Sequence, residues 1–315
     1  MNMNKHSLFI SNFKKVVNLG SKCIAVCFII FLFCWWIMPQ YSGSYNAVLV
    51  DKVERLDSIE EPKIVIIGDS NVAFGMDSEM VEEATGMPVV NMGLHGGLGN
   101  PFHEEMAKIN VTEGDIYIIC HTGYADEDKI PDTTLAWMTI ENHSELWQLI
   151  RWKDSYNLLK GFPPYLKKCI ELWGNGTGNQ EMEGCYARQA FNEYGDVAVA
   201  REKSEYTFTK QYVFDVNDTT VKRLNELNAY LNERGAIMLI AGFPIGDGEY
   251  TPPREAYVAK WKQLEEQLDC EVISHIEDYF MDYDYFYDTE NHLTNEGARV
   301  RTEQLIKDLK QWMEQ

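Results

Sequence analysis

Short apolar runs recur along the chain from residue 63 onward, and segments with helical patterns separate them. Five runs are nearly all apolar and as short as strands that are buried on both faces, which is the pattern of a parallel sheet. They cover residues 63–68, 88–91, 115–120, 236–241 and 271–274. Four other segments have helical patterns: 77–86, 217–234, 252–268 and 294–313. This alternation predicts an α/β domain over residues 61–315, with a doubly wound sheet of about five parallel strands.

Between the third and fourth predicted strands, the sequence does not alternate between strand and helix patterns. We expect residues 127–210 to form an insertion that is largely helical and covers the top of the sheet. Within residues 131–175 lie four of the eight tryptophans: Trp137, Trp147, Trp152 and Trp173. Large aromatic side chains are mostly buried, so these are expected to form the core of the insertion. The alternative is a platform beside the active site on which sugar rings stack.

The N-terminal part has a different pattern, in which a basic segment precedes an apolar run. Residues 1–50 contain four lysines and no acidic residue, and residues 23–38 are almost entirely apolar. A helix of that length spans about 24 Å, slightly less than the roughly 30 Å of a hydrocarbon layer, and residues 16–20 can extend it. The run ends in Trp-Trp-Ile-Met-Pro, which is unlike the small residues of a signal-peptide cleavage site. We predict an uncleaved signal anchor; a cleaved signal peptide and a buried core helix are the alternatives.

The lysines predict the orientation of this anchor. Basic residues stay on the cytoplasmic side of a membrane, so residues 1–22 are expected to be a cytoplasmic tail. Residues 23–41 are then the single transmembrane segment, residues 42–60 a linker, and the domain from residue 61 is extracellular. The sequence therefore predicts a single-pass protein of the cell membrane.

Charge and cysteine content narrow the classes of function. The chain has 49 acidic and 28 basic residues, a net charge of −21, which disfavours nucleic acid because phosphate binding needs a basic surface. Seven cysteines without a C-x-x-C pair indicate neither a disulfide scaffold nor a zinc site. Cys169 and Cys185 would face an oxidising compartment, where they could pair, which the sequence leaves open. His95, His103 and His121 lack metal-site spacing, so no metal and no cofactor is predicted.

Candidate chemistry lies near the two ends of the domain. Ser70 follows the first predicted strand, where its hydroxyl would point into the crevice at the carboxyl end of the sheet. His292 lies in a loop just before the last predicted helix. Two acids, Asp288 and Glu290, precede it in the same loop. A serine nucleophile needs a base in hydrogen-bond reach and a carboxylate that fixes the imidazole tautomer. This combination predicts a serine-based catalytic site.

These residues resemble the SGNH (GDSL-type) hydrolases. Gly68-Asp69-Ser70 is similar to the first block of the family, with Ser70 as the nucleophile. The stretch 91–96, Asn-Met-Gly-Leu-His-Gly, resembles the second block, whose glycine N–H helps to form the oxyanion hole. That role falls on Gly96, with Gly93 as the alternative. The loop around His292 resembles the fifth block, so the resemblance covers residues 60–125 and 215–315 and implies an SGNH or flavodoxin-like three-layer fold.

The chain departs from the family pattern at two places. The acid of the last block usually stands three residues before the histidine, but Thr289 is there; Asp288 is favoured over Glu290 as the acid. The third block lacks its asparagine, which is an oxyanion donor in the family. Backbone groups, Asn71 or His121 would have to replace it.

The resemblance is closest to membrane-anchored SGNH proteins of bacterial surface-polymer clusters. It implies a serine esterase or O-acyltransferase that acts on acyl, mainly acetyl, esters of cell-surface polysaccharide or another acylated glycan. Transfer outside the cell needs a membrane partner that delivers the acyl group, because acetyl-CoA is absent there. A non-catalytic SGNH-fold subunit of a polysaccharide assembly complex is the main alternative, and a lipase- or thioesterase-like enzyme is a third.

Overall fold

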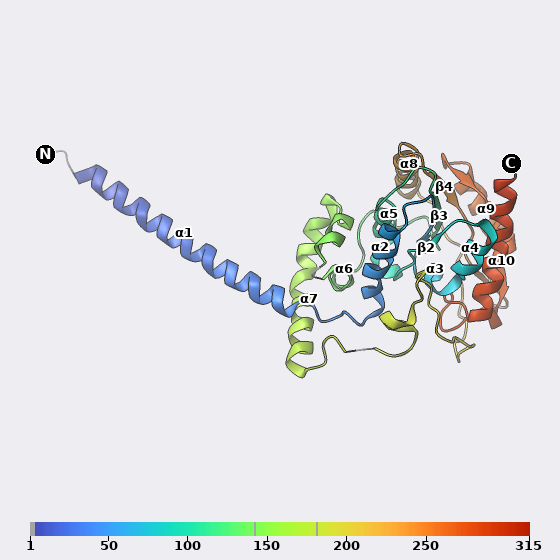
Figure 1. Ribbon diagram of the computed structural model, residues 1–315, viewed down its shortest axis with the longest axis horizontal. Coiled ribbons are helices and arrows are strands. Elements are labelled where there is room, and N and C mark those ends of the chain that lie inside the picture. Colours follow the sequence, from blue (N-terminus) through green and yellow to red (C-terminus); the bar gives the residue numbers. More distant parts are fainter. Residues whose placement is uncertain (1–3, 142, 181) are drawn as a thin grey trace.

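One long helix extends away from the globular part of the molecule (Figure 1). The computed structural model describes residues 4–141, 143–180 and 182–315. Helix α1 (Asn4–Ile37) contains a 25-residue apolar segment, Phe13–Ile37, with a mean hydropathy of 2.2, which is exposed except at its end, where Cys34 and Ile37 are buried. By length and composition, this helix could span a membrane. It begins earlier than the expected segment 23–41 and ends before Pro39, which cannot continue a helix.

The predicted five-stranded parallel sheet is confirmed. Its strands run in the order β2-β1-β3-β4-β6, and every neighbouring pair is parallel. Their bounds are β1 (Ile64–Gly68), β2 (Val89–Asn91), β3 (Ile116–Cys120), β4 (Ile237–Ile240) and β6 (Glu271–Val272). Because Gly68 pairs with Cys120, the segments that follow β1 and β3 leave the sheet side by side at its carboxyl edge. A second sheet pairs β5 (Ile245–Asp247) with β7 (Phe280–Asp282).

Both faces of the five-stranded sheet are buried under helices. On one face, Val65 and Ile67 of β1 belong to an apolar cluster with α2 (Leu49–Ser58), α5 (Asn100–Met106), α8 (Asp218–Asn232) and α9 (Arg254–Glu265). On the other, Ile64 and Ile66 pack with α3 (Ser70–Gly75), α4 (Ser78–Thr85) and α10 (Asn295–Met313). Successive residues of β1 are therefore buried in two different cores, one on each face of the sheet, which explains why the strand is apolar throughout.

Side-chain caps set the starts of three of the predicted helices, α4, α8 and α10. Asp77 accepts a hydrogen bond from Met80 N at the start of α4, and Gly86 ends that helix with φ 71°. Asn217 caps α8 and Thr294 caps α10 in the same way. Each cap satisfies an N–H that has no partner inside its helix, so these polar residues fix where each element begins.

The segment expected to be a linker, residues 42–60, is instead structured. It contains η1 (Tyr45–Val48) and α2, and Leu49, Val53 and Leu56 of α2 are buried. Their spacing of four and three residues places them on one helix face, which covers the sheet. The remaining 3₁₀ helices of the described chain are η2 (Gly96–Leu98), η3 (Ser144–Leu149), η4 (Trp152–Asp154), η5 (Gly184–Tyr186), η6 (Arg188–Ala190), η7 (Ile276–Tyr279) and η8 (Tyr283–Tyr285).

Among its described residues, the insertion is α-helical only as far as Asn175. Helices α6 (Thr133–Ile140) and α7 (Ser155–Asn175) lie beside the end of α1 rather than over the sheet (Figure 1), and the following residues are mostly irregular. Trp137 is buried and its indole N–H donates to Leu158 O, whereas Trp147, Trp152 and Trp173 are exposed. The expected tryptophan core is therefore limited to Trp137. The seven cysteines, all within the described residues, are free, so Cys169 and Cys185 are not bonded.

Candidate functional site

Ser70 is the first residue of α3, directly after the turn that ends β1. Three hydrogen bonds to the Asp69 carboxylate fix this turn. Oδ1 accepts from the backbone N (2.8 Å) and the side-chain N (2.6 Å) of Asn71, and Oδ2 accepts from the Thr122 hydroxyl (2.6 Å). Thr122 follows β3, so Asp69 ties the neighbouring strand ends together and holds Ser70, which is partly exposed, at the carboxyl edge of the sheet.

His292 and Asp288 form a pair in the loop before α10. Nδ1 of His292 lies 2.8 Å from Oδ1 of Asp288. The Thr289 hydroxyl accepts hydrogen bonds from the backbone N of Asn291 (3.2 Å) and of His292 (3.1 Å), which closes a tight turn between the two partners. This turn explains how an acid four residues before the histidine reaches its ring. Because Nδ1 faces Asp288, Nε2 is left for chemistry on the other side of the ring.

The second candidate acid, Glu290, points elsewhere. Its carboxylate is exposed and accepts a hydrogen bond from the Tyr206 hydroxyl at 2.7 Å. Of the two acids that the sequence leaves in competition, Asp288 is therefore the one that contacts His292.

Helix α3, which begins at Ser70, carries the ring on which the histidine packs. The ring of His292 stacks on the ring of Phe74, with centroids 4.0 Å apart and planes at 7°. Phe74 stands four residues after Ser70 in α3, and residues at that spacing share one helix face. The imidazole therefore lies on the side of α3 that also carries Ser70.

Tyr186 is a site residue that the sequence did not indicate. Its hydroxyl donates to Oδ2 of Asp288 at 2.6 Å and lies 3.3 Å from Nδ1 of His292. Tyr186 belongs to η5 in the insertion, and its ring contacts Phe74 and Tyr45 in an aromatic cluster beside the site. No sequence signal pointed to it, because 102 residues separate it from Asp288 in the chain.

The Asp288 carboxyl has a pKa below its usual value. Burial alone would raise the pKa, but the hydrogen bonds from His292 and Tyr186 and the positive charge of His292 outweigh it. Asp288 is therefore an anion at neutral pH. An anion in this place favours the imidazole tautomer that carries its proton on Nδ1 and stabilises the imidazolium.

Of the three oxyanion candidates, two use their N–H groups within the protein. Gly93 N donates to Asn91 Oδ1 at 2.8 Å, and the side-chain N of Asn71 donates to Asp69 and to Cys120 O (2.9 Å). Gly96 is exposed at the start of η2, and a Cβ built on it would lie 3.5 Å from Cβ of Asp69. Its backbone is thus beside the residue that precedes Ser70.

His121, the other side chain expected to replace the missing asparagine donor of the third block, and its neighbour Thr122 are also engaged elsewhere. His121 is fully buried, with Nε2 3.5 Å from a carboxylate oxygen of Glu104. Thr122 comes next in the chain, and its hydroxyl is committed to Asp69. A backbone N–H is therefore the donor that the geometry favours.

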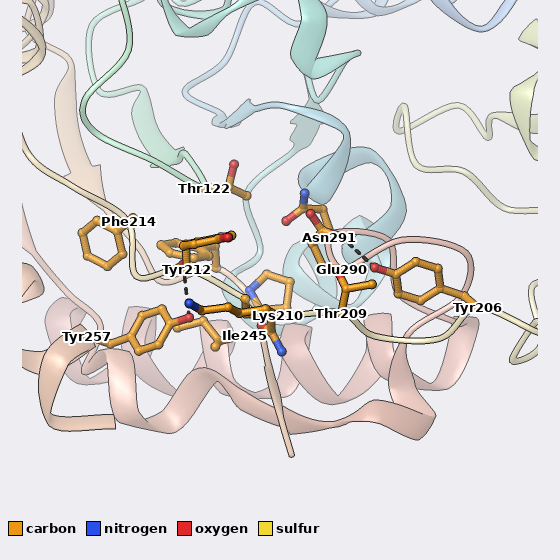
Figure 2. A pocket seen from close by; sticks show the side chains of 13 residues that line it. Thr122, Tyr206, Thr209, Lys210, Tyr212, Phe214, Ile245, Tyr257, Glu290 and Asn291 are labelled. Atoms are coloured by element: carbon orange, nitrogen blue, oxygen red, sulfur yellow. Dashed lines mark hydrogen bonds between the residues drawn. The ribbon is translucent and has the colours of Figure 1, made fainter. Parts of the chain in front are cut away.

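A cavity of about 400 Å³ opens next to the loop that precedes His292 (Figure 2), although Ser70, Asp288 and His292 are not among the residues that line it. Thr122 after β3, Pro244 after β4, and Glu290 and Asn291 from the histidine loop contribute to its wall. Five aromatic side chains and the polar or charged residues Thr209, Lys210 and Gln211 also line it; the aromatic ones are Tyr206, Tyr212, Phe214, Phe243 and Tyr257. The cavity lies where parallel sheets usually bind ligands, at the carboxyl ends of the strands, and its mixture of aromatic rings and polar groups suits a sugar ring.

Comparison with other proteins adds no identification. The sequence matches no model of a known protein family. It also matches no curated protein.

Proposed function

We propose that this protein is a serine-dependent esterase or O-acyltransferase of SGNH type, with Ser70, His292 and Asp288 as its triad. The observation that supports it most is the Asp288–His292 pair. The ring of His292 stacks on Phe74, which belongs to the helix that begins at Ser70. The strand order β2-β1-β3-β4-β6 is the flavodoxin-like order of doubly wound sheets, which agrees with a three-layer SGNH fold.

The proposed reaction has two steps. Ser70 Oγ attacks the acyl carbonyl while Nε2 of His292 takes its proton, and Asp288 stabilises the resulting imidazolium. The backbone N–H of Gly96 stabilises the oxyanion of the tetrahedral intermediate. His292 then gives the proton to the alcohol, which leaves, and the acyl group stays on Ser70 as an acyl-enzyme. Attack on this ester by water gives an esterase, and attack by a sugar hydroxyl gives a transferase.

The proposed setting is the outer face of a bacterial cell membrane. Helix α1 would cross the membrane once, with the lysine-rich N-terminus in the cytoplasm and the domain outside. The substrate would be an acetyl or similar ester of a cell-surface polysaccharide, whose ring fits the aromatic cavity. In the transferase direction, a membrane partner would supply the acyl group.

One observation favours a second candidate function, that of a non-catalytic subunit of a polysaccharide assembly complex. The hydroxyl of Thr122 is used by Asp69, so no side chain at the end of β3 replaces the missing oxyanion donor. A pseudoenzyme would keep the fold and the Asp288–His292 pair but release no acyl group.

Ester turnover separates these functions. The full chain in detergent should release 4-nitrophenol from 4-nitrophenyl acetate and acetate from acetylated xylan. Ser70→Ala should remove both activities, and Ser58→Ala, at an exposed serine of α2, should keep them. Absence of turnover by the unaltered chain on both substrates would favour the non-catalytic subunit.

The orientation is tested separately on intact cells. External protease should degrade the domain, because it lies outside in the proposed topology. Protection of residues 42–315 would reverse the orientation of α1.

A further inference from the structure

Helix α7 and the short η4 before it carry a stripe of exposed apolar side chains. Trp152 is 92% exposed, Tyr156 67% and Leu159 66%, although side chains of this size are usually covered in a folded domain. The stripe consists of Trp152, Tyr156, Leu159, Pro163, Ile170 and Trp173. Most of these positions follow one another by three or four residues, or by a sum of the two, so they form one continuous face of the helix.

The opposite side of α7 is already packed. Leu158, Gly161, Tyr165 and Cys169 are buried, and a Cβ on Gly161 would lie 2.3 Å from the Thr133 hydroxyl of α6. The helix therefore has its own core contact. The exposed stripe is a second apolar face, which the described chain leaves uncovered except at Trp173, where Trp36 of α1 contacts it.

The charge on α7 differs from that of the chain. Its 21 residues include Lys160, Lys167 and Lys168 but only one acid, Glu171, whereas the whole chain has a net charge of −21. Lys160 lies over the ring of Tyr156, with Nζ 4.2 Å from its centroid. A helix with aromatic and aliphatic residues on one face and lysines beside them is typical of segments that lie in a membrane interface.

The position of α7 agrees with such a role. In Figure 1, α7 runs across the end of α1, between that helix and the rest of the domain. The ring of Trp173 meets the ring of Trp36, one residue before α1 ends, with centroids 5.5 Å apart. Tryptophans concentrate at the level of lipid headgroups. A membrane crossed by α1 would therefore have its surface at the level of Trp36 and Trp173.

Hydrogen bonds hold the end of α1 against this part of the insertion. The Glu141 carboxylate accepts from the backbone N of Gln40 (3.0 Å) and of Tyr41 (3.4 Å). The Tyr165 hydroxyl, on the buried side of α7, donates to Met38 O at 2.9 Å. These contacts fix α7 relative to α1, so the stripe keeps its place next to the membrane.

We propose that α7 lies in the outer interface of the bilayer that α1 crosses, as a second membrane contact of the domain. The stripe would enter the boundary between headgroups and acyl chains, while the lysines contact anionic headgroups. This inference rests on the membrane anchoring in the proposed function. With two contacts, the domain would not rotate freely about its anchor, and the cavity would stay at a fixed height above the surface.

A covering protein is the competing occupant of the stripe, and crosslinking separates the two. Leu159 is replaced by photoreactive benzoylphenylalanine in the full chain, which is reconstituted in vesicles of equal parts phosphatidylcholine and phosphatidylglycerol. The matched control carries the same group in place of Val300, an exposed residue of α10 at the far end of the domain (Figure 1). Illumination should give lipid adducts, identified by mass, at position 159 and none above background at position 300.

The same two variants are then illuminated in native membranes. Lipid adducts at position 159 in both settings support the proposal. No lipid adduct in the vesicles, or protein adducts alone in native membranes, would overturn it. Ester turnover and retention in the membrane after carbonate washing are measured on the same samples. Loss of retention would refute the anchor itself, whereas retained, active protein without lipid adducts would refute only the role of α7.

Discussion

Two carboxylates at different ends of the domain share one type of partner but have opposite pKa shifts. Asp288, at the carboxyl edge of the sheet, accepts a hydrogen bond from Tyr186, and Glu141, at the end of α1, accepts one from Tyr165. The pKa of Asp288 is lowered. Burial raises the pKa of Glu141 to about 7, although the hydrogen bonds from Gln40, Tyr41 and Tyr165 oppose it.

The difference comes from the imidazole. Asp288 has His292 beside it, whose charge and hydrogen bond favour the carboxylate, whereas the described residues that donate to Glu141 are neutral. Glu141 also has a backbone φ of 25°, a conformation that the surrounding contacts must hold. Hydrogen bonds alone therefore do not keep a buried acid ionised here. One site is arranged to hold an anion next to a base, and the other to join the long helix to the domain.

The largest effect is expected from removing the imidazole. His292→Ala should lower ester turnover by about 10⁴-fold or more, because the proposed base is lost. The matched control is His275→Ala, which changes an exposed histidine at the start of η7. Full activity of His292→Ala in a steady-state assay would remove His292 from the proposed reaction.

The next effect distinguishes the two acids near His292. Asp288→Asn should lower turnover by up to about 10⁴-fold, since the amide no longer fixes the tautomer. Glu290→Gln should change it little, because Glu290 is exposed and bonded to Tyr206. Kinetics of the purified variants at equal expression check this, and the reverse order would assign the role to Glu290.

A smaller effect is expected at Tyr186. Tyr186→Phe removes one hydrogen bond to Asp288 and should lower turnover roughly tenfold, because a bond to a charged group contributes about 1.5–3 kcal/mol and this one is partly exposed.

The pH profile of the same variant gives a more specific readout. The folded Asp288 has a lowered pKa, so its pairing with His292 is present above the unfolded pKa and is lost as the pH falls through the folded value. Without the hydrogen bond from Tyr186, the Asp288 carboxylate is a stronger base and stabilises the imidazolium form of His292 more, so the acid limb of the rate profile should move to higher pH. Tyr206→Phe, which removes the partner of Glu290, is the control. An unmoved acid limb would show that Tyr186 does not act through Asp288.

The smallest effect on activity is expected at Glu141, and it should appear in stability instead. The folded protein binds a proton at Glu141 up to about pH 7, whereas the unfolded chain releases it near 4.5. Protonation of Glu141 therefore stabilises the folded protein fully below about pH 4.5. As the pH rises toward 7, this contribution is lost, and the free energy of unfolding falls by roughly 3 kcal/mol.

Glu141→Gln should flatten that dependence and leave ester turnover unchanged. Thermal unfolding of the detergent-solubilised full chain between pH 4.5 and 8 measures it, with Glu290→Gln as the control. An unaltered slope in Glu141→Gln would contradict the raised pKa of Glu141.

The contrast between these two ends also explains how far sequence reasoning reached. Strands such as Ile64–Gly68 were predictable because burial on both faces leaves an all-apolar run. The contact of Asp288 with His292 was predictable because four residues and one turn join them. The contacts of Tyr186 with Asp288 and of Glu141 with Gln40 were not predictable, because tertiary packing joins residues that are 102 and 101 positions apart in the chain.

The helix within residues 42–60 was missed, although Leu49, Val53 and Leu56 have helical spacing. The catalytic roles stay predictions.

The most direct test of the central claim is covalent labelling of Ser70. A fluorophosphonate reacts with a serine only when a neighbouring base and an oxyanion site activate the hydroxyl. The full chain should acquire one label, which peptide mass analysis places on Ser70, and Ser70→Ala and His292→Ala should acquire none. Absence of labelling in the unaltered chain, or a label on another serine, would contradict the proposed triad.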